Sequence, residues 1–159
     1  MWGDDRTALD ALRLGEVSSV LDVGCGDGAL TRVLLEECGE SAEVVGCDAD
    51  TKLLRENPAQ CVRGDANTLP FRDSSFELVT CQALLVNLRE PQDAVEEFVR
   101  VASERVACIE PDNSDVRVES TVDSEEDVAR RSRNLYLEGV GTEVSLGADA
   151  AELLREAEL

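Results

Sequence analysis

The chain has 159 residues, of which 35 are acidic, 15 are basic and none is histidine, giving a formal net charge of −20. This length predicts one domain with a single core, and a hydrophobic fraction of 43% excludes a disordered acidic tail. The charge argues against nucleic-acid and membrane partners, and the lack of histidine excludes Ser-His and Cys-His nucleophile pairs and histidine-ligated metals.

The first half of the chain alternates helical and strand patterns. Apolar spacing predicts a short amphipathic helix over residues 5–14. Ser19–Val23 forms an apolar run that predicts a buried strand, and the helix after it places Leu30, Val33 and Leu34 on one face. The other elements expected in this half are a strand over 42–47, a short helix over 50–56 and a strand over 60–63.

The second half continues the same alternation. We expect strands over 76–81 and 105–110, and helices over about 91–102, from Asp123 or Ser124 to Leu137, and over 149–157. Strands that alternate with helices imply an α/β domain with a mainly parallel sheet, and right-handed crossovers place helices on both faces. The sequence therefore predicts a three-layer, doubly wound fold.

The six cysteines predict buried free thiols. They stand at positions 25, 38, 47, 61, 81 and 108, with no CxxC pair, and most of them lie inside apolar runs. Free cysteine behaves as a small buried hydrophobe, so this distribution is typical of a reduced intracellular protein. No signal peptide and no apolar stretch of membrane-spanning length is visible, and we expect a cytoplasmic location.

The basic residues are 14 arginines and a single lysine, Lys52. Few lysines beside a large excess of acids are typical of proteins from salt-loving archaea. In molar salt the repulsion between like charges is screened to about 3 Å, so such a surface is tolerated. The composition therefore predicts a halophilic protein.

A strand that ends in a glycine-rich turn and opens a helix is a ligand-binding arrangement, and Asp22–Gly28 has this form. Glycines allow a tight turn and a close approach to the ligand, while the helix N-terminus offers free N–H groups. Two cofactor classes compete. GCGDGA satisfies the G-x-G-x-x-A dinucleotide pattern, with Asp48 at a suitable distance for a ribose hydroxyl.

The wider string, VLDVGCGDGALTRVL, resembles motif I of the class I S-adenosylmethionine-dependent methyltransferases. In this string the acid Asp22 stands two residues before the first glycine, and the dinucleotide fingerprint has no acid at that position. Residues 64–79 resemble a second block of that family, GDA followed by LPF and D-x-SFE-x-V. The resemblance spans about residues 19–111 and implies the strand order 3-2-1-4-5, with the last two strands of the family's sheet missing.

The resemblance also implies a set of cofactor-binding residues. Asp48 would accept hydrogen bonds from the two ribose hydroxyls, Asp65 would accept one from the adenine amino group, and Ala66 would offer its N–H to the ring. Cys25 is interpreted as a small loop residue rather than a nucleophile. The full predicted set is Asp22, Gly24, Cys25, Gly26, Gly28, Asp48, Ala49, Asp65, Ala66 and Gln82.

The resemblance implies methyl transfer from S-adenosylmethionine to a small-molecule acceptor by in-line displacement. Glu110, at the end of the fifth predicted strand, is the best carboxylate candidate for a general base, although a strand-end acid beside Pro111 is the preferred interpretation. The alternatives are a non-catalytic cofactor-binding module or partner subunit, and an NAD-dependent oxidoreductase. We expect residues 1–159 to form one C-terminally truncated domain, with no bound metal, whose exposed sheet edge favours a homodimer.

Overall fold

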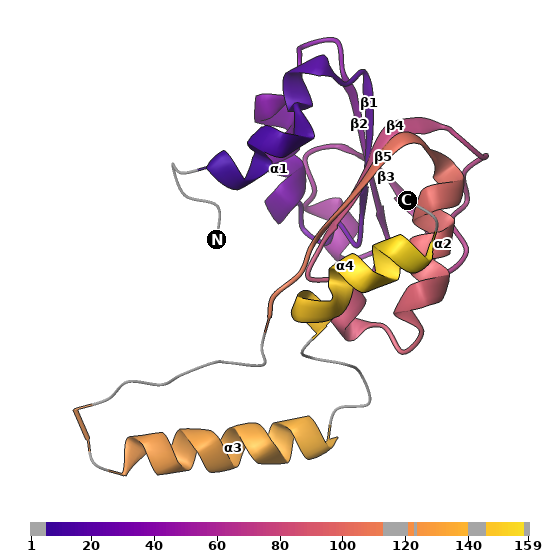
Figure 1. Cartoon of the computed structure of the whole chain (residues 1–159). Coiled ribbons are helices and arrows are strands. Elements are labelled where there is room, and N and C mark those ends of the chain that lie inside the picture. Colours follow the sequence, from indigo (N-terminus) through magenta and orange to yellow (C-terminus); the bar gives the residue numbers. More distant parts are fainter. Residues whose placement is uncertain (1–5, 113–120, 123, 140–145, 158–159) are drawn as a thin grey trace.

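The computed structural model describes residues 6–112, 121–122, 124–139 and 146–157 (Figure 1). Its centre is a five-stranded sheet in which every neighbouring pair of strands is parallel, in the order β3-β2-β1-β4-β5. The strands are β1 (Ser19–Val23), β2 (Glu43–Asp48), β3 (Gln60–Arg63), β4 (Phe76–Gln82) and β5 (Ala102–Ile109). The predicted strand order is therefore confirmed.

Helices cover both faces of the sheet, as the doubly wound fold requires. The α-helices are α1 (Ala29–Glu37), α2 (Pro91–Val101), α3 (Glu125–Gly139) and α4 (Leu146–Glu156). Four short 3-10 segments accompany them, namely η1 (Thr7–Leu12), η2 (Leu14–Glu16), η3 (Leu53–Arg55) and η4 (Leu85–Asn87). In Figure 1, α1 lies on one side of the sheet, α2 and α4 lie on the other, and α3 stands apart. No helix among the described residues has the length and apolarity needed to cross a membrane.

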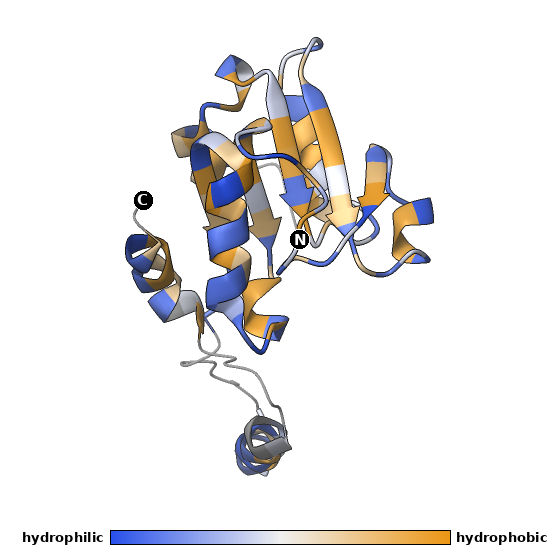
Figure 2. Ribbon diagram, turned by 90° about the vertical axis from the view of Figure 1, so that its right-hand side faces the viewer, coloured by the Kyte–Doolittle hydropathy of each residue, from blue (hydrophilic) through white to orange (hydrophobic). Residues whose placement is uncertain are grey.

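The core consists of two apolar clusters, one on each face of the sheet. Leu34 of α1 packs with Val20 and Leu78 in one cluster, and Phe98 of α2 packs with Leu21 and Val79 in the other. Neighbouring residues of one strand thus enter opposite layers, because successive side chains of a strand point to opposite faces. Figure 2 shows apolar strands between helices whose outer faces are polar. Both faces are covered, which explains why the central strands are continuous apolar runs.

Two predicted helices are shorter and tighter in the structure. Instead of one helix over residues 5–14, two 3-10 segments form, separated by Arg13 in the left-handed region at φ 47°. The predicted helix over 50–56 shrinks to η3, because the Asp48 and Asp50 carboxylates accept the N–H groups of Asp50 and Lys52. Such side-chain-to-backbone bonds compete with the hydrogen bonds of a helix. The strand β5 begins three residues before the predicted Arg105.

The chain after β5 meets the start of α4. A Cβ added to Gly147 would lie 2.5 Å from the Asp112 nitrogen and from the carbonyl carbon and oxygen of Pro111. This close backbone contact accepts only glycine. It brings the residues on either side of 113–145 together at the carboxyl end of the sheet, and Leu146 is buried there against the core cluster that contains Phe98.

Candidate cofactor site at the carboxyl end of the sheet

The glycine-rich turn between β1 and α1 has three glycines with positive φ, at 69° for Gly24, 51° for Gly26 and 94° for Gly28. A Cβ on Gly24 would meet the Leu84 side chain at 2.8 Å, and one on Gly28 would meet Pro58 at 2.6 Å. At Gly26 the nearest atom would be 3.9 Å away. The first and third glycines therefore serve packing within the protein, whereas a Cβ on Gly26 would make only an ordinary van der Waals contact with Leu53.

A hollow of about 170 Å³ lies over this turn. The end of β4 contributes Gln82 to its wall, and the end of β1 contributes Asp22. Its other lining residues are Gly24, Cys25, Gly26, Asp27, Ala29 and Leu30. Ligands of open α/β sheets bind outside the carboxyl ends of the strands at the point where strand order reverses, and β1 and β4 flank that point here.

Asp48, at the end of β2, joins the neighbouring loop to the glycine-rich turn. One carboxylate oxygen accepts the N–H of Gly26 at 2.9 Å, and the other accepts the N–H of Asp50 at 2.8 Å. Each oxygen of a carboxylate can accept more than one hydrogen bond, so both keep capacity for a ligand. Ala49, which follows it, is exposed. Asp48 thus shapes the turn and also presents acceptors beside Gly26.

Asp22 is a buried acid, 1% exposed, beneath the same turn. The Thr31 hydroxyl donates a hydrogen bond to its carboxylate at 2.6 Å, and the Asn57 amide donates to the Thr31 oxygen at 3.1 Å and to the Gly26 carbonyl at 3.4 Å. Burial raises the pKa of Asp22 from 3.8 to about 7, and the nearby Asp48 charge adds to this effect while the Thr31 bond opposes it. Sequence patterns do not single out Thr31 or Asn57.

Asp65 and Ala66 lie at the end of β3, with Asp65 exposed and Ala66 half-buried. The Asp65 carboxylate accepts the Asn67 N–H at 3.0 Å and so starts a tight turn. The structure places both residues at the same end of the sheet as Asp48, since Arg63 pairs with Asp48 in the β2–β3 register. They do not line the hollow over the glycine-rich turn.

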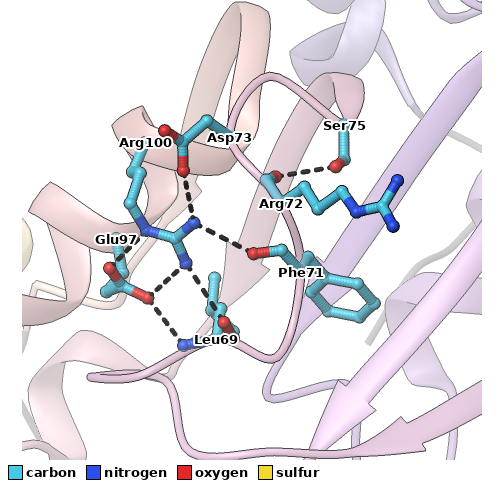
Figure 3. Close-up of polar contacts among 7 residues, drawn as sticks. All are labelled: Leu69, Phe71, Arg72, Asp73, Ser75, Glu97 and Arg100. Atoms are coloured by element: carbon cyan, nitrogen blue, oxygen red, sulfur yellow. Dashed lines mark hydrogen bonds and ion pairs between the residues drawn. The ribbon is translucent and has the colours of Figure 1, made fainter.

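Arg100 of α2 fixes the loop that follows these two residues (Figure 3). Its guanidinium donates to the carbonyl oxygens of Phe71 at 2.9 Å and Leu69 at 3.1 Å, and it pairs with Glu97 at 2.6 Å and Asp73 at 2.8 Å. The Glu97 carboxylate accepts the Leu69 N–H at 2.7 Å. The hydrogen bond from Arg100 lowers the pKa of Glu97, so both groups stay charged at neutral pH.

The thiols near the site are packing groups. Cys25 is 6% exposed, and its sulfur would lie 2.7 Å from a Cβ added to Gly46 of β2. Burial raises the pKa of Cys25 far above its usual range and that of Cys47 to about 11. Since the thiolate is the nucleophilic form, neither residue is activated for covalent chemistry. The described part of the chain also holds no group of three or more acidic or cysteine side chains suited to a metal ion.

The turn predicts a contrast between two alanine variants. Gly28→Ala should lower the free energy of unfolding by about 2 kcal/mol or more, for two reasons. The new Cβ would collide with Pro58, and an alanine at this positive φ is strained. Gly26→Ala should lower the free energy of unfolding by only about 1 kcal/mol, the cost of its positive φ. Its methyl group would, however, stand at the hollow that Gly26 lines and should weaken ligand binding. Urea unfolding and ligand titration of both variants would check this, and equal stability losses would contradict it.

The sequence profile of a family described as a methyltransferase domain matches residues 21–109. This chain belongs to that methyltransferase family. It is 34% identical over 123 residues to the demethylmenaquinone methyltransferase of Lactiplantibacillus plantarum, an alignment that covers 69% of this chain and 52% of that protein. The methyltransferase domain described here thus spans about half the length of the curated relatives it matches.

Solved structures agree with this assignment. A methyltransferase structure from Bacillus halodurans superposes with a TM-score of 0.69 at 22% identity, covering 98% of this chain and 68% of that one, and so shows the shared fold. A SAM-dependent methyltransferase from Methanosarcina mazei gives a TM-score of 0.52 at 25% identity, covering 62% and 54%. The predicted family, its Rossmann-like fold and its cofactor, S-adenosylmethionine, are therefore confirmed.

The methyltransferase domain offers groups that fit this cofactor. Gly26 leaves the space that close approach of a ligand needs, Asp48 offers acceptors suited to two neighbouring ribose hydroxyls, and Asp22 places an acid beside the hollow for a cationic group. Gln82 adds an amide to the same wall. Asp65 and Ala66 lie further along the sheet end, where a long ligand extending past Asp48 would reach them. The role of each residue in binding stays a prediction.

Proposed function

We propose that this domain binds S-adenosylmethionine across the carboxyl ends of β1, β2 and β3 and uses it to methylate a small-molecule acceptor. One observation carries the proposal, namely the carboxylate of Asp48 bonded to the N–H of Gly26 at 2.9 Å. This bond supports an acceptor pair suited to ribose hydroxyls beside Gly26, the glycine of the turn at which an added Cβ would meet no atom closer than 3.9 Å. The acid-bearing motif and the hollow next to it support the same arrangement.

The binding roles follow from the position of each group. We assign the ribose to Asp48 and Ala49, and the adenine to Asp65 and Ala66. The methionine end belongs in the hollow, where Gly24, Cys25 and Gly26 line the wall and Asp22 and Gln82 supply polar atoms. Gly28 supports the turn from behind, against Pro58. A cationic ammonium or sulfonium near Asp22 would favour its ionised form, because an opposite charge nearby stabilises a carboxylate.

When bound, the cofactor supplies an electrophilic methyl group on a sulfonium whose leaving group is neutral. The protein's contribution is to hold donor and acceptor in line and to exclude water. A base is required only where the acceptor must lose a proton early. The relatives named as demethylmenaquinone methyltransferases support a small-molecule acceptor rather than nucleic acid for this chain as well. The acidic charge of −20 points in the same direction.

A second function, cofactor binding without catalysis in a partner subunit, rests on Glu110. The oxygens of this carboxylate accept three backbone N–H groups of the turn after β4, which favours a structural role for the best carboxylate candidate for a base. Turnover with a demethylquinone would exclude the non-catalytic function. Binding without turnover, in the longest form of the protein that is expressed, would favour it.

Thermal unfolding in molar salt tests the proposed cofactor. S-adenosylhomocysteine at about a hundred times its Kd should stabilise the fold by about 2.7 kcal/mol, because it binds only the native state. NAD serves as the matched control, since it shares the adenosine moiety and is the cofactor of the competing oxidoreductase hypothesis. A shift of the melting temperature with NAD and none with S-adenosylhomocysteine would contradict the proposal.

The remaining expectations stay predictions. A homodimer would form through the free edge of β5, which lies at the end of the described sheet and is paired there with β4 alone. Analytical ultracentrifugation in low and molar salt would report it. A cytoplasmic location and a halophilic habitat rest on composition.

A further inference from the structure

The turn that follows β4 is held by Ile109, the last residue of β5, and by Glu110, which follows it. Four consecutive backbone N–H groups point to this strand end. Ala83 donates to the Ile109 carbonyl at 2.9 Å, while Leu84 and Leu85 both donate to one oxygen of the Glu110 carboxylate at 3.0 Å. Val86 donates to the other carboxylate oxygen at 3.3 Å. No donor in this run is left to solvent.

Successive N–H groups that converge in this way form a concave anion site, of the kind that binds phosphates in other folds. Here a carboxylate of the same chain occupies it. Ala83 opens the turn in the left-handed region at φ 50°, and this backbone conformation aims the next three N–H groups at one point. The Cys81 sulfur lies 3.5 Å from the Glu110 oxygen that accepts the N–H groups of Leu84 and Leu85. The charge of Glu110 is therefore engaged at the base of the turn.

The turn after β4 contacts the proposed cofactor site. Leu84, whose N–H is bound by Glu110, lies against Gly24 so closely that an added Cβ would come within 2.8 Å of its side chain. Gln82, just before the turn, lines the hollow over the glycine-rich turn. A chain of direct contacts thus runs from Glu110 to the turn after β4 and from there to Gly24.

We propose that Glu110 is a positioning residue, which holds Leu84 against Gly24 and so sets the shape of the cofactor site, and that it is not the proton acceptor of the reaction. The inference rests on the proposed function, since it assigns the hollow beside Gly24 to the cofactor. It predicts that substitution of Glu110 lowers the affinity for the cofactor, although Glu110 is absent from the lining of the hollow.

Two substitutions of Glu110 and one control test this role. Glu110→Ala removes the acceptor of three N–H groups and should raise the Kd of S-adenosylhomocysteine about tenfold in calorimetric titration. Glu110→Gln keeps one acceptor oxygen but turns an N–H donor toward the turn, and should raise the Kd by about threefold. The control is Glu77→Ala, which removes a half-buried carboxylate that accepts the Ser18 N–H at 2.6 Å, at the opposite end of β4. It should leave the Kd unchanged.

Hydrogen exchange gives a readout that needs no ligand. The amides of Leu84, Leu85 and Val86 should exchange about tenfold or more faster in both Glu110 variants, while Glu77→Ala leaves them protected. Glu110→Gln preserves the side-chain shape and carries the test should the alanine variant not fold. Unchanged affinity together with unchanged exchange in Glu110→Gln would overturn the proposal, and so would an equal loss of affinity in Glu77→Ala.

The outcomes separate this inference from the proposed function. A wild-type chain that does not bind S-adenosylhomocysteine contradicts the proposed function, whatever the Glu110 variants do in exchange. A wild-type chain that binds it, with Glu110 variants that bind it equally well, contradicts only the positioning role. If Glu110 acted as a base, its substitution would lower turnover and leave the affinity for S-adenosylhomocysteine unchanged. The affinity measurement therefore also decides between the two roles.

Discussion

Asp48→Ala should weaken the binding of S-adenosylhomocysteine about a hundredfold, which corresponds to about 2.7 kcal/mol. The substitution removes the proposed acceptors for the ribose hydroxyls. It also frees the N–H of Gly26, which the carboxylate accepts at 2.9 Å, so the turn itself loses an anchor. Charge-assisted hydrogen bonds contribute about 1.5–3 kcal/mol each, so a loss of this size needs little more than one of them.

Isothermal titration in molar salt would measure the effect. Asp50→Ala is the matched control, because the carboxylate of this neighbouring acid accepts the local backbone N–H of Lys52. It should change the Kd by less than about twofold. Asp48→Asn, which keeps one acceptor oxygen, should fall between the two. An Asp48→Ala variant that retains wild-type affinity would remove this residue from the cofactor site.

Asp22→Asn should flatten the dependence of stability on pH. Burial raises the pKa of Asp22 in the folded state from 3.8 to about 7. An acid whose folded-state pKa is raised contributes its full stability below the pKa of the unfolded chain, where it is neutral in both states. That contribution is lost as the pH rises through the folded-state pKa. The wild type should therefore lose on the order of 4 kcal/mol between about pH 4 and pH 7, from this group alone.

Urea unfolding from pH 5 to pH 8 at constant salt isolates this group as the difference between wild type and Asp22→Asn. An asparagine oxygen can still accept the hydrogen bond that the Thr31 hydroxyl donates, so the variant should be the more stable form at pH 8. Asp27→Asn, an exposed acid of the same turn, should keep the wild-type slope. Parallel curves for wild type and Asp22→Asn would show that Asp22 does not titrate in this range.

The fold and the strand-end residues were accessible from sequence because their patterns are local. The apolar run of β1 and the three glycines of the turn report on backbone conformation within a few residues, and the structure confirms the parallel order around them. Gly26 and Gly28 look alike in sequence. Only the structure distinguishes them, because the Pro58 side chain that packs against Gly28 comes from a loop thirty positions away.

The supports of the site were not accessible, because their partners are distant in sequence. Thr31 follows Asp22 by nine residues, and Asn57 reaches Thr31 and the Gly26 carbonyl from the loop before β3. Glu110 reads as a strand-end acid beside a proline until its three N–H donors from the turn after β4 are seen. The helix predicted over 50–56 was overestimated for a related reason. Apolar spacing does not record that the Asp48 and Asp50 carboxylates accept backbone N–H groups there.

The contact between Gly147 and the Pro111–Asp112 backbone has an evolutionary consequence. The residues on either side of 113–145 meet at this one place, and α4 packs from there against α2, so the length of the stretch between them does not set this contact. Insertions and exchanges in that stretch, which includes α3, are compatible with an unchanged cofactor end of the sheet. We therefore expect related domains to vary in this segment while keeping a glycine at position 147, where an added Cβ would collide with the Pro111–Asp112 backbone.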